Sequence, residues 1–261
     1  MQIDQRSKKD FVILGAGMTG LSLAYWLLKE KENSITIIDR MESDAASRRN
    51  AGFITSGSIT YYNFLLENFG PKKAERLWKF SKENIRGLAA LIKNENIDCS
   101  FYKGGSYTLS VDKCLALPGK ISLRENLPGF DGHNVYFDPE EMSYDPMEFV
   151  HQLKKMLISK GIEFVQDNIT SIDELKQKVK AKRYFIATNS AFVKNVAIIP
   201  QRAQASKFKI KTNLKNANYY LPSEKIYFRI LNNDLYIGGK RLVDAQSEQT
   251  SNLGINKKVQ G

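Results

Sequence analysis

Short apolar runs alternate with an amphipathic segment over the first forty residues. Residues 9–14 form an apolar run that ends at a glycine, which is typical of a buried parallel strand. Apolar residues then recur at helical spacing to about Lys31, so they predict a helix that begins inside the glycine loop. A second β-rich run, residues 35–39, ends in an acid. Strand, helix and strand in this order predict one nucleotide-binding half of a doubly wound sheet.

The middle of the chain predicts a long helix followed by antiparallel strands. An apolar stripe over residues 71–94 includes Leu77, Trp78 and Phe80, and it predicts a helix with these side chains in the core. Residues 101–111 predict two antiparallel strands around a turn at Gly104-Gly105. Antiparallel character therefore interrupts the α/β pattern.

The α/β pattern returns after residue 140. Asp145-Pro146 predicts a helix start, with the aspartate as N-cap and the proline in the first turn. That helix places Val150, Leu153 and Leu157 inward, and the runs IEFVQ and YFIAT predict buried strands. Residues 227–231 and 235–237 predict a hairpin. We therefore expect two interleaved domains: residues 1–85 with 141–205, and residues 86–140 with 206–261.

Composition limits the classes of protein to which the chain can belong. Of its 261 residues 42% are hydrophobic, which allows a substantial core. No run approaches the roughly eighteen apolar residues of a membrane span, and no apolar signal region precedes Phe11, so a cytoplasmic location is expected. The two cysteines are expected to be reduced thiols, and with only two histidines no metal site is expected.

The net charge of +11 raises the question of an anionic partner. The lysines are scattered along the chain, and they accompany many isoleucines and asparagines. No nucleic-acid motif or aromatic-basic interleaving goes with the charge, so a nucleic-acid partner is not expected.

The glycine loop carries the first candidate chemistry. Gly15 allows the tight turn, Gly17 lets the backbone approach a pyrophosphate, and Gly20 lets the helix pack on the strand. The free N–H groups and positive dipole end of the helix favour phosphate there. Asp39, which follows Gly20 by 19 residues, can accept a hydrogen bond from a ribose hydroxyl and would repel the 2′-phosphate of NADP. The motif by itself does not separate NAD from FAD.

The polar segment after Asp39 narrows the choice of cofactor. Ser47, Arg49 and Asn50 precede a flexible Ala51-Gly52, and such a loop can reach over a pyrophosphate. Here the sequence resembles the D-amino-acid-oxidase-like (DAO) superfamily of FAD-dependent oxidoreductases, in particular its glycine/sarcosine oxidase and γ-glutamylputrescine oxidase-like branches. Ala45, Arg48 and Asn189 stand where the family pattern has glycine.

The resemblance continues through the segments at MSYDP, YFIATNSAF, PQRAQ and LYIGGKR, in the family's order. It implies an α/β fold: a Rossmann-like FAD-binding domain of the GR2/DAO type with an interleaved antiparallel α+β substrate domain. It also implies that the chain lacks the family's C-terminal part, and that the incomplete sheet edge can mediate self-association or bind a partner subunit. The residues expected to bind FAD are Gly15, Ala16, Gly17, Met18, Thr19, Gly20, Asp39, Arg40, Ser47, Arg48, Arg49, Asn50, Ala51, Gly52, Ile169, Ala187 and Thr188.

The family implies two-electron oxidation of an amine or amino acid, in which hydride moves from the carbon bearing nitrogen to flavin N5. No separate proton-transferring pair is required, and catalytic residues are not identified. Tyr227 and Arg229 are candidates to bind a substrate carboxylate, with Tyr61 as a further candidate; the alternative is an ordinary strand with an exposed cation and a packed aromatic. Two other functions stay open: flavin or nucleotide binding without turnover, and oxidation of a modified tRNA base.

Overall fold

A computed structural model of the chain describes residues 9–40, 45–57, 62–111, 118, 121–123, 127–189 and 199–260. The chain divides into two compact units that interleave along the sequence. Unit 1 comprises residues 1–50, 97–99 and 146–199, and unit 2 comprises residues 51–96, 100–145 and 200–261. These limits differ from the expected ones, because the expected boundary at residues 85/86 lies inside the helix α2 (Tyr62–Asn94). Residues 51–85 therefore belong to the antiparallel unit.

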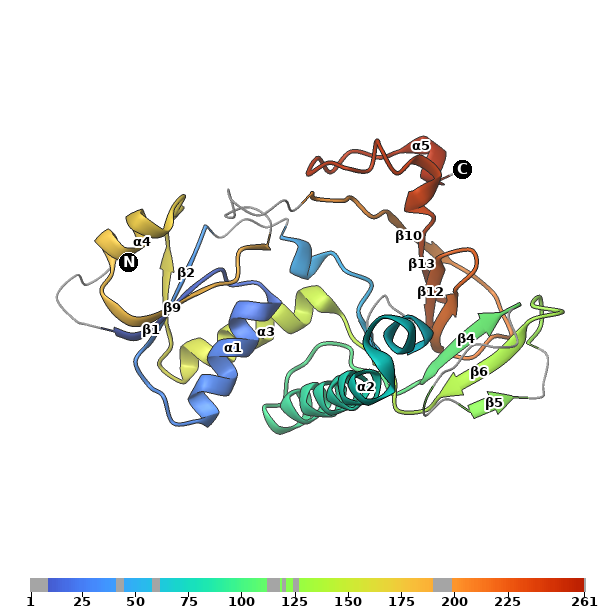
Figure 1. Cartoon of the computed structure of the whole chain (residues 1–261), viewed down its shortest axis with the longest axis horizontal. Coiled ribbons are helices and arrows are strands. Elements are labelled where there is room, and N and C mark those ends of the chain that lie inside the picture. The colour runs from blue at the N-terminus through green and yellow to red at the C-terminus, as the bar shows by residue number, and fades with distance from the viewer. Residues whose placement is uncertain are drawn as a thin grey trace. The chain divides into compact units, whose positions relative to one another are not determined.

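Unit 1 is built on a parallel sheet with the strand order β8-β2-β1-β9. All four strands were predicted from their apolar runs. Figure 1 shows α4 on one side of these strands and α1 with α3 on the other. The bounds of the elements are β1 Lys9–Leu14, α1 Met18–Lys29, β2 Ile35–Asp39, η1 Ala46–Arg48, α3 Pro146–Ser159, β8 Glu163–Gln166, α4 Ile172–Lys178 and β9 Ala181–Ile186.

The core of unit 1 follows from the alternation of side chains along its strands. Val12 and Leu14 of β1 point to one face, where they pack with Ile38 of β2 and with Leu175 of α4. On α3 the three residues predicted to face inward, Val150, Leu153 and Leu157, are all buried. Burial of these apolar faces on both sides of the sheet is what a parallel sheet requires.

Strand β9 forms one edge of this sheet. Within the described residues it pairs only with β1, and Ile186 at its end is 40% exposed. Lys182 and Arg183 are exposed on the same strand, and charged side chains of this kind discourage unplanned edge-to-edge pairing. Self-association through this edge stays a prediction.

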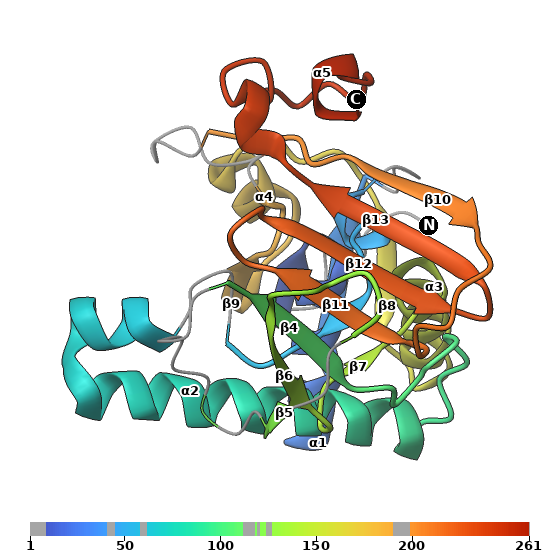
Figure 2. The same ribbon diagram turned by 90° about the vertical axis from the view of Figure 1, so that its right-hand side faces the viewer.

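Unit 2 is built on a seven-stranded sheet with the order β10-β13-β12-β11-β4-β6-β5, which Figure 2 shows from one face. All its neighbours are antiparallel except β11 and β4. A small antiparallel pair, β3 with β7, also belongs to unit 2. The bounds are β3 Phe53–Ile54, β4 Ser106–Ser110, β5 Ile121–Leu123, β6 Asn134–Asp138, β7 Met142–Ser143, β10 Ala205–Lys209, β11 Ala217–Leu221, β12 Ile226–Leu231, β13 Asp234–Gly239, η3 Arg241–Asp244 and α5 Lys257–Gln260.

One predicted hairpin of unit 2 is confirmed and the other is wrong. Strands β12 and β13 pair antiparallel across Asn232 and Asn233, whose φ angles of 52° and 64° suit a tight two-residue turn. The turn at Gly104-Gly105 does not join two strands of a hairpin, because β4 pairs with β6 and β11 while Tyr102 bridges to Ser143. The partners of β4 come from distant parts of the sequence.

Helix α2 corrects the predicted apolar stripe. The helix is interrupted at Gly70, with φ 74° and ψ 166°, so its second stretch begins at Pro71 as predicted. Trp78 is buried, but Leu77 is 45% and Phe80 is 68% exposed. Residues 78 and 80 lie about 200° apart around a helix, so one core cannot receive both.

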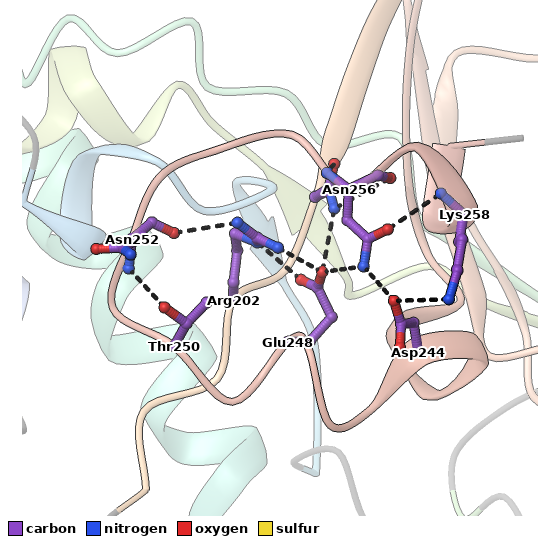
Figure 3. Close-up of polar contacts among 8 residues, drawn as sticks. Arg202, Asp244, Glu248, Thr250, Asn252, Asn256 and Lys258 are labelled. Atoms are coloured by element: carbon purple, nitrogen blue, oxygen red, sulfur yellow. Dashed lines mark hydrogen bonds and ion pairs between the residues drawn. The ribbon is translucent and has the colours of Figure 1, made fainter.

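A polar cluster ties the C-terminal segment to the residues before β10 (Figure 3). Arg202 donates two hydrogen bonds to Glu248, from Nε to Oε2 at 3.0 Å and from Nη2 to Oε1 at 2.8 Å. Asn256 Nδ2 donates to Glu248 Oε1 at 2.8 Å and to Asp244 Oδ2 at 3.0 Å. Glu248 is 1% exposed, so its charge depends on these donors.

This cluster predicts a loss of stability in acid. The Arg202 guanidinium holds the pKa of Glu248 below its usual range, despite the opposing effect of burial. Its contribution is therefore present above the ordinary glutamate pKa of about 4.3, and it is lost as pH falls through the lower folded-state value. Between pH 5 and pH 3, urea unfolding should show a smaller fall in stability for Glu248→Gln than for the wild type. Parallel falls would contradict this role of Glu248.

Candidate cofactor-binding site

The turn after β1 requires glycine at its first position. Gly15 has a φ of 109°, and its N–H donates to Ile38 O at 2.7 Å. A Cβ at this position would lie 2.5 Å from Ala187 O, beyond the end of β9. Two strands thus meet the backbone at Gly15, and only glycine fits between them.

Gly20 brings the first turn of α1 against the same loop. A Cβ at Gly20 would lie 1.9 Å from Gly15 O, closer than any real contact between these atoms. The position of the helix N-terminus over the end of β1 therefore depends on the missing side chain. This is the packing role that the sequence suggests for the third glycine of the motif.

The N-terminus of α1 receives the polar segment from η1. Gly17 is the N-cap residue, and Met18 N–H donates to Ser47 Oγ at 2.9 Å. A Cβ at Gly17 would lie 2.8 Å from the same hydroxyl oxygen. The first turn of α1 contains no acidic side chain. The helix thus presents an N-terminal end whose dipole favours an anion.

Asp39 lies beside this helix end. It closes β2, and its Oδ2 accepts a hydrogen bond from Ala16 N–H at 2.7 Å. One carboxylate oxygen therefore fixes the glycine loop itself. Lys154 of α3 belongs to the same neighbourhood. The pKa of its ammonium group is lowered, mainly by burial and further by the charge of Arg48, while the charge of Asp39 opposes this shift. Sequence reasoning did not select Lys154, because its only local signal is a lysine on an amphipathic helix.

The end of β9 completes the described part of the site. Ala187 N–H donates to Leu14 O at 2.7 Å, which places Thr188 after the point where β1 and β9 diverge. The Thr188 hydroxyl oxygen is buried and has no hydrogen-bond partner within the described residues. Asn189 has a φ of 60°, a left-handed conformation that asparagine tolerates better than most residues. An asparagine can therefore stand where the family pattern has glycine.

The family model for "DAO: FAD dependent oxidoreductase" matches residues 10–257. The chain belongs to the DAO family. Its cofactor is accordingly FAD, and its parallel sheet is the Rossmann-like part of the DAO fold, as the sequence predicts.

Two curated proteins illustrate the distance to sequence relatives. "Probable oxidoreductase OrdL" of Haemophilus influenzae is 23% identical over 205 residues, which are 69% of this chain and 46% of that protein. "FAD-dependent oxidoreductase domain-containing protein 1" of Bos taurus is 26% identical over 190 residues, which are 62% of this chain and 37% of that protein. The chain thus spans less than half the length of these two relatives.

Solved structures support the same fold. L-amino acid deaminase from Proteus myxofaciens superposes with a TM-score of 0.68 at 15% identity, covering 92% of this chain and 60% of that one. Glycine oxidase from Bacillus cereus superposes with a TM-score of 0.63 at 17% identity, covering 89% and 70%. At these identities the likeness concerns the DAO fold.

The described residues fit the FAD of the family in two respects. The close approaches at Gly15 and Gly20 leave backbone N–H groups, in place of side chains, at the N-terminus of α1. The buried Thr188 hydroxyl, next to the same loop, has no hydrogen-bond partner among the residues that the structure describes.

Within the described residues, no cluster of His, Cys, Asp or Glu is arranged to hold a metal ion, and no helix has the length and apolarity to cross a membrane.

The other predicted FAD residues take different positions. Asn50 Nδ2 donates to Ser47 O at 2.9 Å, so it supports the loop. Arg40 and Arg49 are exposed, and Ile169 is packed in the core of unit 1. Ala51 and Gly52 fall in unit 2. The FAD contacts of all these residues stay predictions.

The predicted substrate residues lie in unit 2 or outside the described residues. Tyr61 is one of the latter. Tyr227 of β12 makes an edge-to-face contact with Phe53 at 5.7 Å, and burial raises the pKa of its phenol. Arg229 is buried, so the alternative expectation of an exposed cation on an ordinary strand is wrong. Whether these residues contact substrate stays a prediction.

Proposed function

We propose that this chain binds FAD at the N-terminus of α1 and belongs to an oxidoreductase that oxidises the C–N bond of an amine or amino acid. The observation that carries the cofactor site is the convergence of three features: the helix N-terminus, the Asp39 carboxylate and the Ser47 hydroxyl. The family to which the chain belongs supports FAD as the occupant.

Each group at the site has a proposed task. Backbone N–H groups of the first turn of α1 after Met18, whose own N–H donates to Ser47 Oγ, bind the pyrophosphate, and the helix dipole favours its charge. Asp39 holds Ala16 N–H and accepts a ribose hydroxyl. Arg48 adds positive charge beside Asp39 and Lys154, and the Thr188 hydroxyl supplies a further hydrogen bond.

FAD, when bound, supplies the two-electron chemistry: hydride passes from the carbon bearing nitrogen to flavin N5, and water hydrolyses the resulting imine. The protein has to orient the cofactor and the substrate and to exclude competing reactions. An amino-acid or amine substrate is supported by the solved structures of the same fold, which include a glycine oxidase and L-amino acid deaminases. The substrate roles of Tyr61, Tyr227 and Arg229 remain part of this proposal.

The absorbance spectrum of the purified protein tests both parts of the proposal. We expect a yellow protein whose flavin band bleaches under anaerobic conditions with a member of an amine and amino-acid panel. A protein that takes up no added FAD would overturn the cofactor site. A flavoprotein that no panel member bleaches would instead favour flavin binding without turnover.

Replacing the Asp39 carboxylate tests the ribose contact. Asp39→Ala should weaken FAD binding by about tenfold, because a charge-assisted hydrogen bond and the support of the glycine loop are both lost. Fluorescence titration with FAD measures the change. Asp173→Ala, which removes an exposed acid of α4, is the control and should bind FAD like the wild type. Equal affinity of Asp39→Ala and the wild type would remove Asp39 from the site.

A further inference from the structure

Arg229 is a buried cation on an interior strand of the seven-stranded sheet. It lies on β12, and its side chain is almost fully enclosed, with 4% of the residue exposed. Its Nη1 donates to Tyr144 O at 2.7 Å, and its guanidinium carbon lies 4.5 Å from the centre of the Tyr236 ring. Burial of an arginine costs free energy, so its contacts must offset that cost.

The backbone of Tyr144 also bonds to Gly52, the residue that precedes β3. Tyr144 N–H donates to Gly52 O at 2.9 Å, so one peptide unit beyond β7 accepts from Arg229 and its neighbour donates to Gly52. In the same region β7 pairs with β3 through Ser143 and Phe53. Gly52 is buried and has a φ of 71°, which favours glycine at that position.

A second buried side chain, that of Asn218, bonds to the backbone of β7. Asn218 of β11 lies opposite Arg229 in the sheet register, and its Nδ2 donates to Met142 O at 2.8 Å. Two neighbouring strands of the sheet, which run side by side in Figure 2, thus each send one polar side chain to a backbone carbonyl at β7 or just after it. These bonds fix the strand that in turn holds residues 52–54.

We infer that Arg229 is a positioning residue: through the peptide groups of Tyr144 it fixes Gly52, the last residue of the polar segment that begins at η1. Ser47, five residues earlier, holds the N-terminus of α1. Ser47 belongs to unit 1 and Gly52 to unit 2, and only four residues of chain join them, so loosening Gly52 increases the freedom of this joining segment. The consequence for FAD rests on the proposed function.

This role differs from that of a substrate ligand. A guanidinium that binds a substrate carboxylate presents its paired donors to the ligand. In Arg229, Nη1 donates to Tyr144 O and the guanidinium lies over the Tyr236 ring, while the buried Nε has no hydrogen-bond partner within the described residues. The two roles therefore differ in what loss of the side chain does. Loss of a pure substrate ligand would leave both the backbone of residues 52–54 and the affinity for FAD unchanged.

Hydrogen exchange on the FAD-free protein tests the positioning role without reference to any ligand. In Arg229→Met, amides of residues 52–56 and 142–145 should exchange about tenfold faster than in the wild type, because a hydrogen bond to a buried charged donor is lost. Arg183→Met, at an exposed position of β9, is the matched control and should exchange like the wild type. Unchanged exchange in these segments of Arg229→Met would overturn the inference.

Fluorescence titration with FAD is the second measurement. Arg229→Met should bind FAD about tenfold more weakly, and Arg229→Lys, which keeps the charge without the planar fork, should lie between it and the wild type. If Arg229→Met does not fold, Arg229→Lys carries both comparisons. Faster exchange with unchanged FAD affinity would overturn the link to the cofactor. A wild type that binds no FAD would overturn the proposed function, and the exchange experiment would still decide whether Arg229 positions Gly52.

Discussion

Gly20→Ala should reduce FAD affinity about a hundredfold, which corresponds to about 2.7 kcal/mol. The added Cβ would lie 1.9 Å from Gly15 O, and a backbone carbonyl cannot rotate away as a flexible side chain can. The helix must therefore shift from the end of β1, and its N–H groups move with it. The folding stability of Gly20→Ala should fall as well, although most glycine-to-alanine changes within helices stabilise the fold by up to about 1 kcal/mol.

Thermal unfolding of the FAD-free protein separates the packing effect from the cofactor effect. We expect Gly20→Ala to be destabilised by about 2 kcal/mol, as for other overpacked positions. Gly254→Ala is the matched control: its Cβ would lie 3.5 Å from Arg202 Nη1, an ordinary contact, so stability and FAD binding should stay as in the wild type. An FAD affinity of Gly20→Ala equal to that of the wild type would show that the close approach does not position the site.

Lys82→Met should destabilise the folded chain by about 3 kcal/mol, because it leaves a buried carboxylate without its cation. Lys82 Nζ of α2 lies 2.5 Å from Asp138 Oδ2 at the end of β6, and the Asp138 side chain is 1% exposed. Asp138 Oδ1 retains the hydrogen bond from Glu140 N–H at 3.0 Å, which offsets only part of the loss. Urea unfolding measures the change in free energy.

An exposed ion pair on the same helix is the control. Lys79 Nζ lies 3.0 Å from Glu75 Oε1, and the two side chains are 70% and 62% exposed. Lys79→Met should therefore lower the free energy of unfolding by less than about 0.5 kcal/mol. Adding Asp138→Asn to Lys82→Met should recover part of the lost stability, since the buried charge is then removed. A cost of Lys82→Met no larger than that of Lys79→Met would show that the pair does not hold α2 to the sheet.

Much of the candidate site could be predicted because its signals are local. The strand bounds 9–14 and 35–39, the helix between them and the carboxylate at Asp39 all lie within about thirty residues. Within such a span, the spacing of glycines and apolar residues restricts the backbone to few conformations. Ser47 and Met18 were both expected to bind FAD, but the hydrogen bond between them was not predicted.

Strand pairing in unit 2 could not be predicted in the same way. The alternation along residues 106–110 indicates a strand, but it does not indicate that β11 will lie on one side of it and β6 on the other. The hairpin of β12 and β13 was predictable because its turn is two residues long. Strands β4 and β11 are more than a hundred residues apart, and their pairing depends on which side chains are buried across the whole sheet. The sequence pattern within one strand does not contain this information.

The sequence by itself thus determined the α/β class, the strand-helix-strand unit with its glycine turn, and the acid that closes β2, because each depends on residues that are neighbours along the chain. Only the tertiary structure decided that Phe80 faces solvent, that Lys154 lies near Asp39, and that Arg229 is buried against Tyr144. These outcomes depend on which distant segments pack together. An arginine in an alternating strand is either exposed to solvent or buried and hydrogen-bonded, depending on which segments cover that face of the sheet.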